Sequence, residues 1–200
     1  MSRSRGNKGA AAMFAAALSF SGHSVLAAEE VPPKAQVCLA CHGPGGNASD
    51  PATPSLAGQP AQFLSIQLFL FREGKRKDAQ MSPMAASLSN AEMNELAAYF
   101  ARQKSAAPSH KTDPENAAAG RRLTELHHCV QCHGPALVGL QHIPRLAGQQ
   151  FAYLKAQLRG FKAGTRGEFD GNMSSAAQPL SEKDIEILAD YLSGLTAPRD

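Results

Sequence analysis

Apolar residues recur at helical spacing in two segments that share one pattern. In residues 63–76 and again in residues 153–166 they fall three or four positions apart, as on one face of an amphipathic α-helix. Gly74 and Gly164 follow these stripes, and glycine is common just past the end of a helix. The matched positions are Phe63, Leu64, Gln67, Leu68 and Phe71 in the first segment and Tyr153, Leu154, Gln157, Leu158 and Phe161 in the second.

A second helical pattern occurs in residues 88–100 and 180–192. Ser89 and Ser181 are the predicted N-caps of these helices, because Glu92 and Asp184 follow three residues later and complete a capping box. No segment alternates between apolar and polar residues as a half-exposed strand does. The pattern therefore predicts an all-α protein.

These helices belong to an internal repeat. The sequence CLACHGP at residues 38–44 returns as CVQCHGP at 129–135, and PSLAGQ at 54–59 returns as PRLAGQ at 144–149. Because all elements keep their order, we predict two tandem helical domains, at residues 28–103 and 115–200, joined by a linker at 104–114. Only 6% of the chain is aromatic, so such small domains need a cofactor, metal or disulfide to complete their cores.

The first 27 residues have the features of a secretory signal peptide. Three basic residues precede an apolar run from Ala10 to Phe20, which is too short to span a membrane, and small residues follow it. Its removal takes three of the 20 basic residues, so the 17 that remain match the 17 acidic ones. The mature chain gives no charge argument for nucleic-acid binding, and we expect it in the periplasm.

Two thiols and an imidazole lie within each CxxCH motif, at Cys38, Cys41 and His42 and again at Cys129, Cys132 and His133. Export to an oxidising compartment makes disulfides the first alternative, but disulfides leave both histidines unexplained. A structural zinc ion needs four ligands, and one motif supplies three at most. Covalent haem accounts for all the positions, since the thiols bind the porphyrin and the imidazole binds the iron. We therefore predict two covalently bound haem c groups.

The repeat also indicates the sixth iron ligands. Met81 and Met173 both lie seven residues before the Leu-Ser that opens the last helix. In this register Met84 aligns with Ala176 and Met93 with Ile185, so we expect Met84 and Met93 to belong to the core. Met84 stays open as a ligand of the first iron, and His142 is a weaker rival in the second half.

Together the paired CxxCH, LAGQ, Phe-x-x-Gly-x-Arg and Met-before-Leu-Ser motifs resemble those of the cytochrome c4 family, the two-domain dihaem class I cytochromes c. The resemblance covers nearly the whole mature chain. One departure is that the first half leaves room for barely two helical turns between Pro33 and its CxxCH, whereas residues 113–129 supply a full helix before the second motif.

The resemblance implies which carbonyls orient the histidines, and the repeat adds two matched arginines. Backbone carbonyls of Pro54 and Pro144 are expected to orient the two histidines. Arg76 and Arg166 are candidate partners of the haem propionates, and a solvated basic face is the equal alternative for these two arginines.

The function that the resemblance implies is electron transfer without an enzymatic activity of its own. Its redox partners would be a quinol-oxidising complex as donor and a terminal oxidase or another protein as acceptor. We expect a monomer, with peripheral membrane association left open. The alternative is a dihaem subunit of a periplasmic dehydrogenase such as flavocytochrome c sulfide dehydrogenase, and a dihaem enzyme is a third, less favoured hypothesis.

Overall fold

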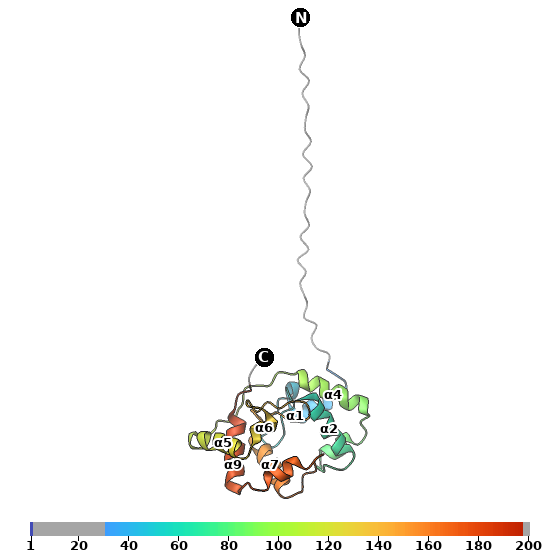
Figure 1. The fold of residues 1–200 in the computed structure, drawn as a ribbon. Coiled ribbons are helices and arrows are strands. Elements are labelled where there is room, and N and C mark those ends of the chain that lie inside the picture. The colour runs from blue at the N-terminus through green and yellow to red at the C-terminus, as the bar shows by residue number, and fades with distance from the viewer. Residues whose placement is uncertain (2–30, 198–200) are drawn as a thin grey trace. The chain divides into compact units, whose positions relative to one another are not determined.

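A computed structural model describes Met1 and residues 31–197 of the chain (Figure 1). The predicted signal peptide lies outside the described residues apart from Met1. Over the described part every regular element is helical, and Leu140 and Ile143 form an isolated bridge. None of these helices has the length and apolar character needed to cross a membrane. The all-α prediction is confirmed.

Each half of the chain has its own apolar core. The first half contains α1 (Ala35–His42), a 3₁₀ turn η1 (Pro44–Gly46), α2 (Ala61–Arg72), α3 (Met81–Ala85) and α4 (Asn90–Arg102). The second half contains α5 (Pro114–Leu126), α6 (Cys129–His133), α7 (Phe151–Lys162), α8 (Asn172–Ala177) and α9 (Glu182–Gly194). Helix α2 packs on α4 and α7 packs on α9, so the repeat predicted from the sequence is also a repeat in structure.

The predicted helix ends are confirmed in both halves. Ser89 and Ser181 cap α4 and α9, and each makes the reciprocal bonds of a capping box with Glu92 or Asp184. Gly74 follows α2 at φ 65°, in the left-handed region that glycine enters without strain. These local signals fix where the long helices begin and end.

The two halves differ before their CxxCH motifs. In the first half α1 begins only three residues before Cys38, whereas α5 precedes the second motif with 13 residues and packs across α9. The crossing is close at Gly120, where a Cβ atom would lie 2.2 Å from Cβ of Tyr191. Glycine is therefore required at this point of α5.

The segment between the halves is bound along its length. Asn47 bonds to the carbonyl of Lys104 and to the N–H of Ala106, and the Ser105 hydroxyl donates to the carbonyl of Ala57. His110 stacks on the ring of Phe151. The predicted linker is thus a strap that follows the surface of both halves.

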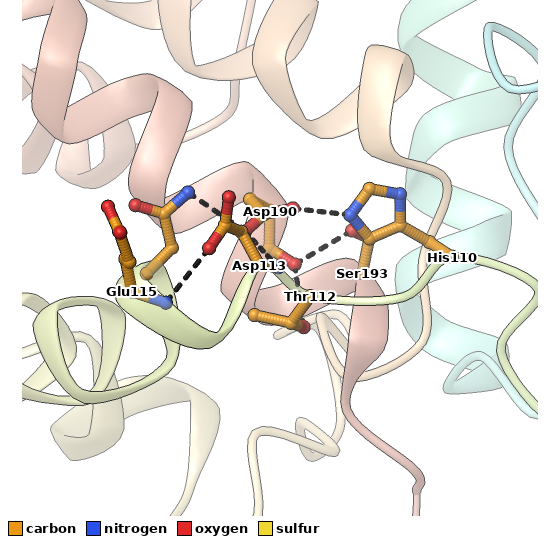
Figure 2. A network of polar contacts seen from close by, with 7 residues as sticks. His110, Thr112, Asp113, Glu115, Asp190 and Ser193 are labelled. Carbon is orange, nitrogen blue, oxygen red and sulfur yellow. Dashed lines mark hydrogen bonds and ion pairs between the residues drawn. The ribbon is translucent and has the colours of Figure 1, made fainter.

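Asp190 of α9 anchors the end of this strap (Figure 2). Its carboxylate lies 2.5 Å from Nε2 of His110 and accepts 3.0 Å bonds from the Asp113 N–H and the Asn116 amide. Burial alone would raise the pKa of Asp190, but these donors outweigh it and lower the pKa. His110, which the sequence marked only as a linker residue, is therefore part of a structural contact.

Gly120→Ala should destabilise the protein by about 1 to 3 kcal/mol, the cost of overpacking a tight contact, although alanine favours helices. Ala118→Gly on the exposed side of α5 is the control, and it should cost about 1 kcal/mol through helix propensity alone. Denaturant unfolding of the haem-loaded protein measures both. Stabilisation by Gly120→Ala would contradict the close crossing.

Asp190→Asn should destabilise the protein by about 1 to 3 kcal/mol at pH 6, because a buried network loses its charged acceptor. The lowered pKa of Asp190 gives the sign of the pH dependence: its stabilisation is present above the unfolded pKa of about 3.9 and is lost as the pH falls through the folded pKa. The difference between wild type and variant should therefore shrink from pH 6 to pH 3. Glu186→Gln, a half-exposed ion-pair partner on α9, is the control and should change stability by less than about 1 kcal/mol. An equal difference at pH 3 and pH 6 would count against the anchor.

Candidate haem-attachment sites

Each CxxCH motif forms a short helix that ends at a buried histidine. Helix α1 holds Cys38, Cys41 and His42, and the five residues of α6 are the second motif itself. The helical turn brings the two thiols of a motif near one face, three residues apart. His42 is 5% exposed and His133 is 4% exposed, so both rings face the interior.

The four cysteines are free thiols in the structure. One thiol of each pair, Cys38 or Cys129, is half-buried, and the other is exposed. Burial raises the pKa of the two half-buried thiols. No group of three or more His, Cys, Asp or Glu side chains within the described ranges is placed to hold a metal ion.

Backbone carbonyls orient both histidines. The Nδ1 atom of His42 lies 2.8 Å from the carbonyl oxygen of Pro54, and Nδ1 of His133 lies 2.8 Å from that of Pro144. Burial lowers the pKa of both imidazoles, and the carbonyls offset this only in part. A neutral ring that donates through Nδ1–H leaves the Nε2 lone pair available for a metal.

The two candidate methionines are each placed by an acidic side chain. Met81 begins α3, and its backbone N–H donates to the Asp78 carboxylate at 2.8 Å. Met173 lies in α8, and its N–H donates to Glu168 at 2.9 Å. Both side chains are partly buried and pack against the core of their own half. The repeat in the sequence does not single out these carboxylates, because Asp78 lies three residues before its methionine and Glu168 lies five residues before its own.

The structure also places the other methionines and the histidine that were considered as axial ligands. Met84 is 47% exposed, so the expectation that it belongs to the core is wrong. Met84 follows Met81 by three residues in the helix, so the two side chains point about 60° apart around the helix axis. Met93 is 2% exposed and belongs to the core as expected, and His142 is exposed in its loop.

Arg76 and Arg166 meet side chains of the opposite half. Arg76 donates to Gln157 at 2.8 Å and to the Tyr153 hydroxyl at 3.2 Å in the other half, and to Gln67 of its own half at 2.7 Å. Arg166 donates across to the same Gln67 at 3.3 Å. Each guanidinium also stacks on a phenylalanine of its own half. Arg76 is only 8% exposed. The alternative of a solvated basic face is therefore wrong for Arg76.

Among the described residues, neither Arg76 nor Arg166 of this cluster forms an ion pair with an acidic side chain. The pKa of Arg166 is lowered to about 10, mainly because the group is buried and also because Arg76 is positively charged. The carboxylate of Glu168 offsets this in part, since it raises the pKa of Arg166 through its charge without forming an ion pair with the guanidinium group. Burial raises the pKa of Tyr153, but the two guanidinium groups outweigh this and lower it. The cluster therefore favours an anionic group beside it.

Two buried guanidinium nitrogens without hydrogen-bond partners bear on whether haem fits these sites. Nε of Arg166 and Nε of Arg145 are buried without a hydrogen-bond partner. Burial also lowers the pKa of Arg145 to about 10. Among the described residues these two arginines have no ion-pair partner, so their unsatisfied donors fit the carboxylates of a haem, whose ring would also supply apolar volume to each core. The residues present therefore fit two haem groups.

The fold and the paired motifs define a c-type cytochrome with two haem domains. The family model described as cytochrome c oxidase, cbb3-type, subunit III, matches residues 34–100 and 115–192. The chain is 38% identical over 192 residues to a cytochrome c4 from Thiocapsa roseopersicina, covering 88% of this chain and 98% of that one. It is 39% identical over 176 residues to a thiosulfate dehydrogenase electron acceptor from Thiomonas intermedia, covering 81% and 80% of the two chains.

A solved structure agrees with these relatives. Reduced recombinant cytochrome c4 from Pseudomonas stutzeri superposes with a TM-score of 0.76 at 36% identity, covering 82% of this chain and 95% of that one. The chain belongs to the cytochrome c4 family. Its cofactors are two covalently bound haem c groups.

Met81→Ala should abolish the weak long-wavelength sulfur-to-iron band of one haem and lower that haem's potential, because the thioether favours reduced iron. Met173→Ala should do the same for the other haem only. Absorption spectra and redox titrations of the haem-loaded protein measure both effects.

Met84→Ala is the matched control for Met81→Ala. Its side chain is half exposed, so it should leave the band intact and change stability by about 0.5 kcal/mol or less. Loss of the band in Met84→Ala, with the band retained in Met81→Ala, would reverse the assignment of the first site.

Proposed function

We propose that this chain carries single electrons between redox proteins through two His/Met-ligated haems. In this proposal Cys38 and Cys41 attach the first haem and Cys129 and Cys132 the second. The axial ligands are His42 with Met81 and His133 with Met173. A haem held in this way exchanges electrons and has no open position for oxygen or peroxide.

The observation that carries the proposal is that both halves build the two axial sides in the same way. In each half a proline carbonyl orients a buried histidine, and a carboxylate bonded to the backbone fixes the start of the methionine segment. Two equivalent closed sites fit electron transfer better than catalysis at an iron that exchanges ligands. In this proposal the described residues hold and orient the haems, and the chemistry is electron exchange at the two irons.

The physiological partners belong to the same proposal. We place the mature chain in the periplasm, after removal of residues 1–27, between a quinol-oxidising complex and a terminal oxidase. The family model that matches the chain is described as a subunit of a cytochrome c oxidase, which supports a terminal oxidase as the acceptor.

A second candidate function is an electron-accepting partner of a dehydrogenase. The relative from Thiomonas intermedia, named as a thiosulfate dehydrogenase electron acceptor, favours this over the flavocytochrome alternative. The same two haem sites would serve both functions. The distinction therefore depends on which proteins bind the chain.

Intact mass of the protein purified from periplasm should exceed the mass of residues 28–200 by two haems. A Cys38→Ser/Cys41→Ser variant should carry one haem, since each motif acts alone. A wild-type mass that matches the polypeptide with two disulfides would refute the proposal.

Purification of the native protein under mild conditions separates the two candidates. A free carrier should elute as a monomer and reduce an added terminal oxidase preparation. Stoichiometric co-purification of a dehydrogenase, with thiosulfate-dependent haem reduction, would replace the first candidate by the second.

A further inference from the structure

Two buried glutamines cross between the halves of the chain in a reciprocal way. The amide of Gln149 accepts from the N–H of Ser55 at 2.8 Å and donates to the Ser55 carbonyl at 2.9 Å. The amide of Gln59 makes the same pair of bonds with Arg145, both at 2.9 Å. The two glutamines close the two LAGQ motifs, and Ser55 and Arg145 hold equivalent positions in the repeat.

These bonds are fully removed from water. Gln59 is 2% exposed and Gln149 is 4% exposed, and all four bonds lie in buried surroundings. A buried amide that loses its partners is costly, so both side chains are held in a single orientation. The glutamines are therefore rigid parts of the contact between the halves.

Each glutamine accepts a hydrogen bond from the N–H of a peptide group whose carbonyl orients a histidine. The N–H of Ser55 and the carbonyl of Pro54 belong to one peptide, and that carbonyl accepts from Nδ1 of His42. A hydrogen-bonded chain therefore runs from His42 through this peptide to Gln149 in the other half. The equivalent chain runs from His133 through the Pro144 carbonyl and the Arg145 N–H to Gln59.

We propose that Gln149 and Gln59 are positioning residues that set the electron-donating strength of the proximal histidine in the opposite half. The inference rests on the proposed function, because it concerns the potentials of the two haems. An acceptor on the N–H side of a peptide polarises it and makes its carbonyl a better acceptor, by roughly 10–30% per bond. Each half of the protein thus adjusts the haem of the other.

The direction of the effect follows from the chemistry of the imidazole. A stronger bond from Nδ1–H to the proline carbonyl leaves the ring richer in electrons, and a richer ligand favours oxidised iron. Loss of the glutamine acceptor weakens this bond. Removing Gln149 should therefore make the haem on His42 easier to reduce, and removing Gln59 should do so for the haem on His133.

Gln150 provides a matched control within the same contact. Its amide also crosses between the halves and donates to the Ala48 carbonyl at 2.6 Å, but Ala48 is not part of a peptide that orients a histidine. A variant at Gln150 therefore loses a bond between the halves and leaves both histidine chains intact. It separates loosening of the contact from a change in ligand strength.

The experiment compares Gln149→Met, Gln59→Met and Gln150→Met in the full haem-loaded protein. Methionine keeps the length of glutamine and removes the hydrogen bonds of its amide, which for Gln149 include one accepted from the Gln150 N–H at 2.9 Å. Spectroelectrochemical titration gives the two midpoint potentials, and hyperfine-shifted proton resonances assign each potential to a haem. Gln149→Met should increase the reduction equilibrium constant of the His42 haem severalfold and leave the other unchanged, Gln59→Met should show the opposite selectivity, and Gln150→Met should shift neither.

Gln149→Glu tests the sign. A carboxylate still accepts from the Ser55 N–H and adds negative charge, so the potential of the His42 haem should stay at or below the wild-type value. Equal shifts of both haems, or a shift in Gln150→Met as large as in Gln149→Met, would overturn the inference and leave the glutamines as contact residues only. Two haems with intact sulfur-to-iron bands and unmoved potentials would also overturn it without touching the proposed function, whereas missing haems or bands would count against the proposed function itself.

Discussion

The peptide between Pro54 and Ser55, and its counterpart between Pro144 and Arg145, carries a hydrogen bond on each side. Its carbonyl holds a histidine, and its N–H is held by a glutamine of the other half. One short loop therefore fixes both the ligand of its own haem site and the contact with the second site. Because a buried peptide must satisfy both groups, neither bond can be lost without cost.

This constraint explains why the contact between the halves is polar. A pair of independent domains joined by a linker could meet through apolar side chains alone. Here the contact contains amide pairs and the guanidinium groups of Arg76 and Arg166, with no carboxylate bonded to them within the described ranges. An anionic group beside these guanidinium groups would balance their buried charge.

The two halves nevertheless differ in how they close. The second half has α5, which crosses α9 at Gly120, and the strap that ends on Asp190 also belongs to its surface. The first half begins its motif helix after Lys34 and lacks an equivalent of α5 among the residues described. Among the described residues, α5 therefore covers the second core at a place where the first core has no helix, and Tyr191 packs against it.

The sequence alone determined the elements and the chemistry of the sites, because these depend on local spacing. Helical stripes, Ser89 with Glu92, and the two CxxCH motifs all act within a few residues, and the repeat register singled out Met81 and Met173 over their neighbours. Only the tertiary structure decided which residues meet across the halves. The pairing of Gln149 with Ser55, separated by 94 positions, leaves no trace in local pattern, and the exposure of Met84 and the anchoring of His110 likewise depend on which surfaces pack together.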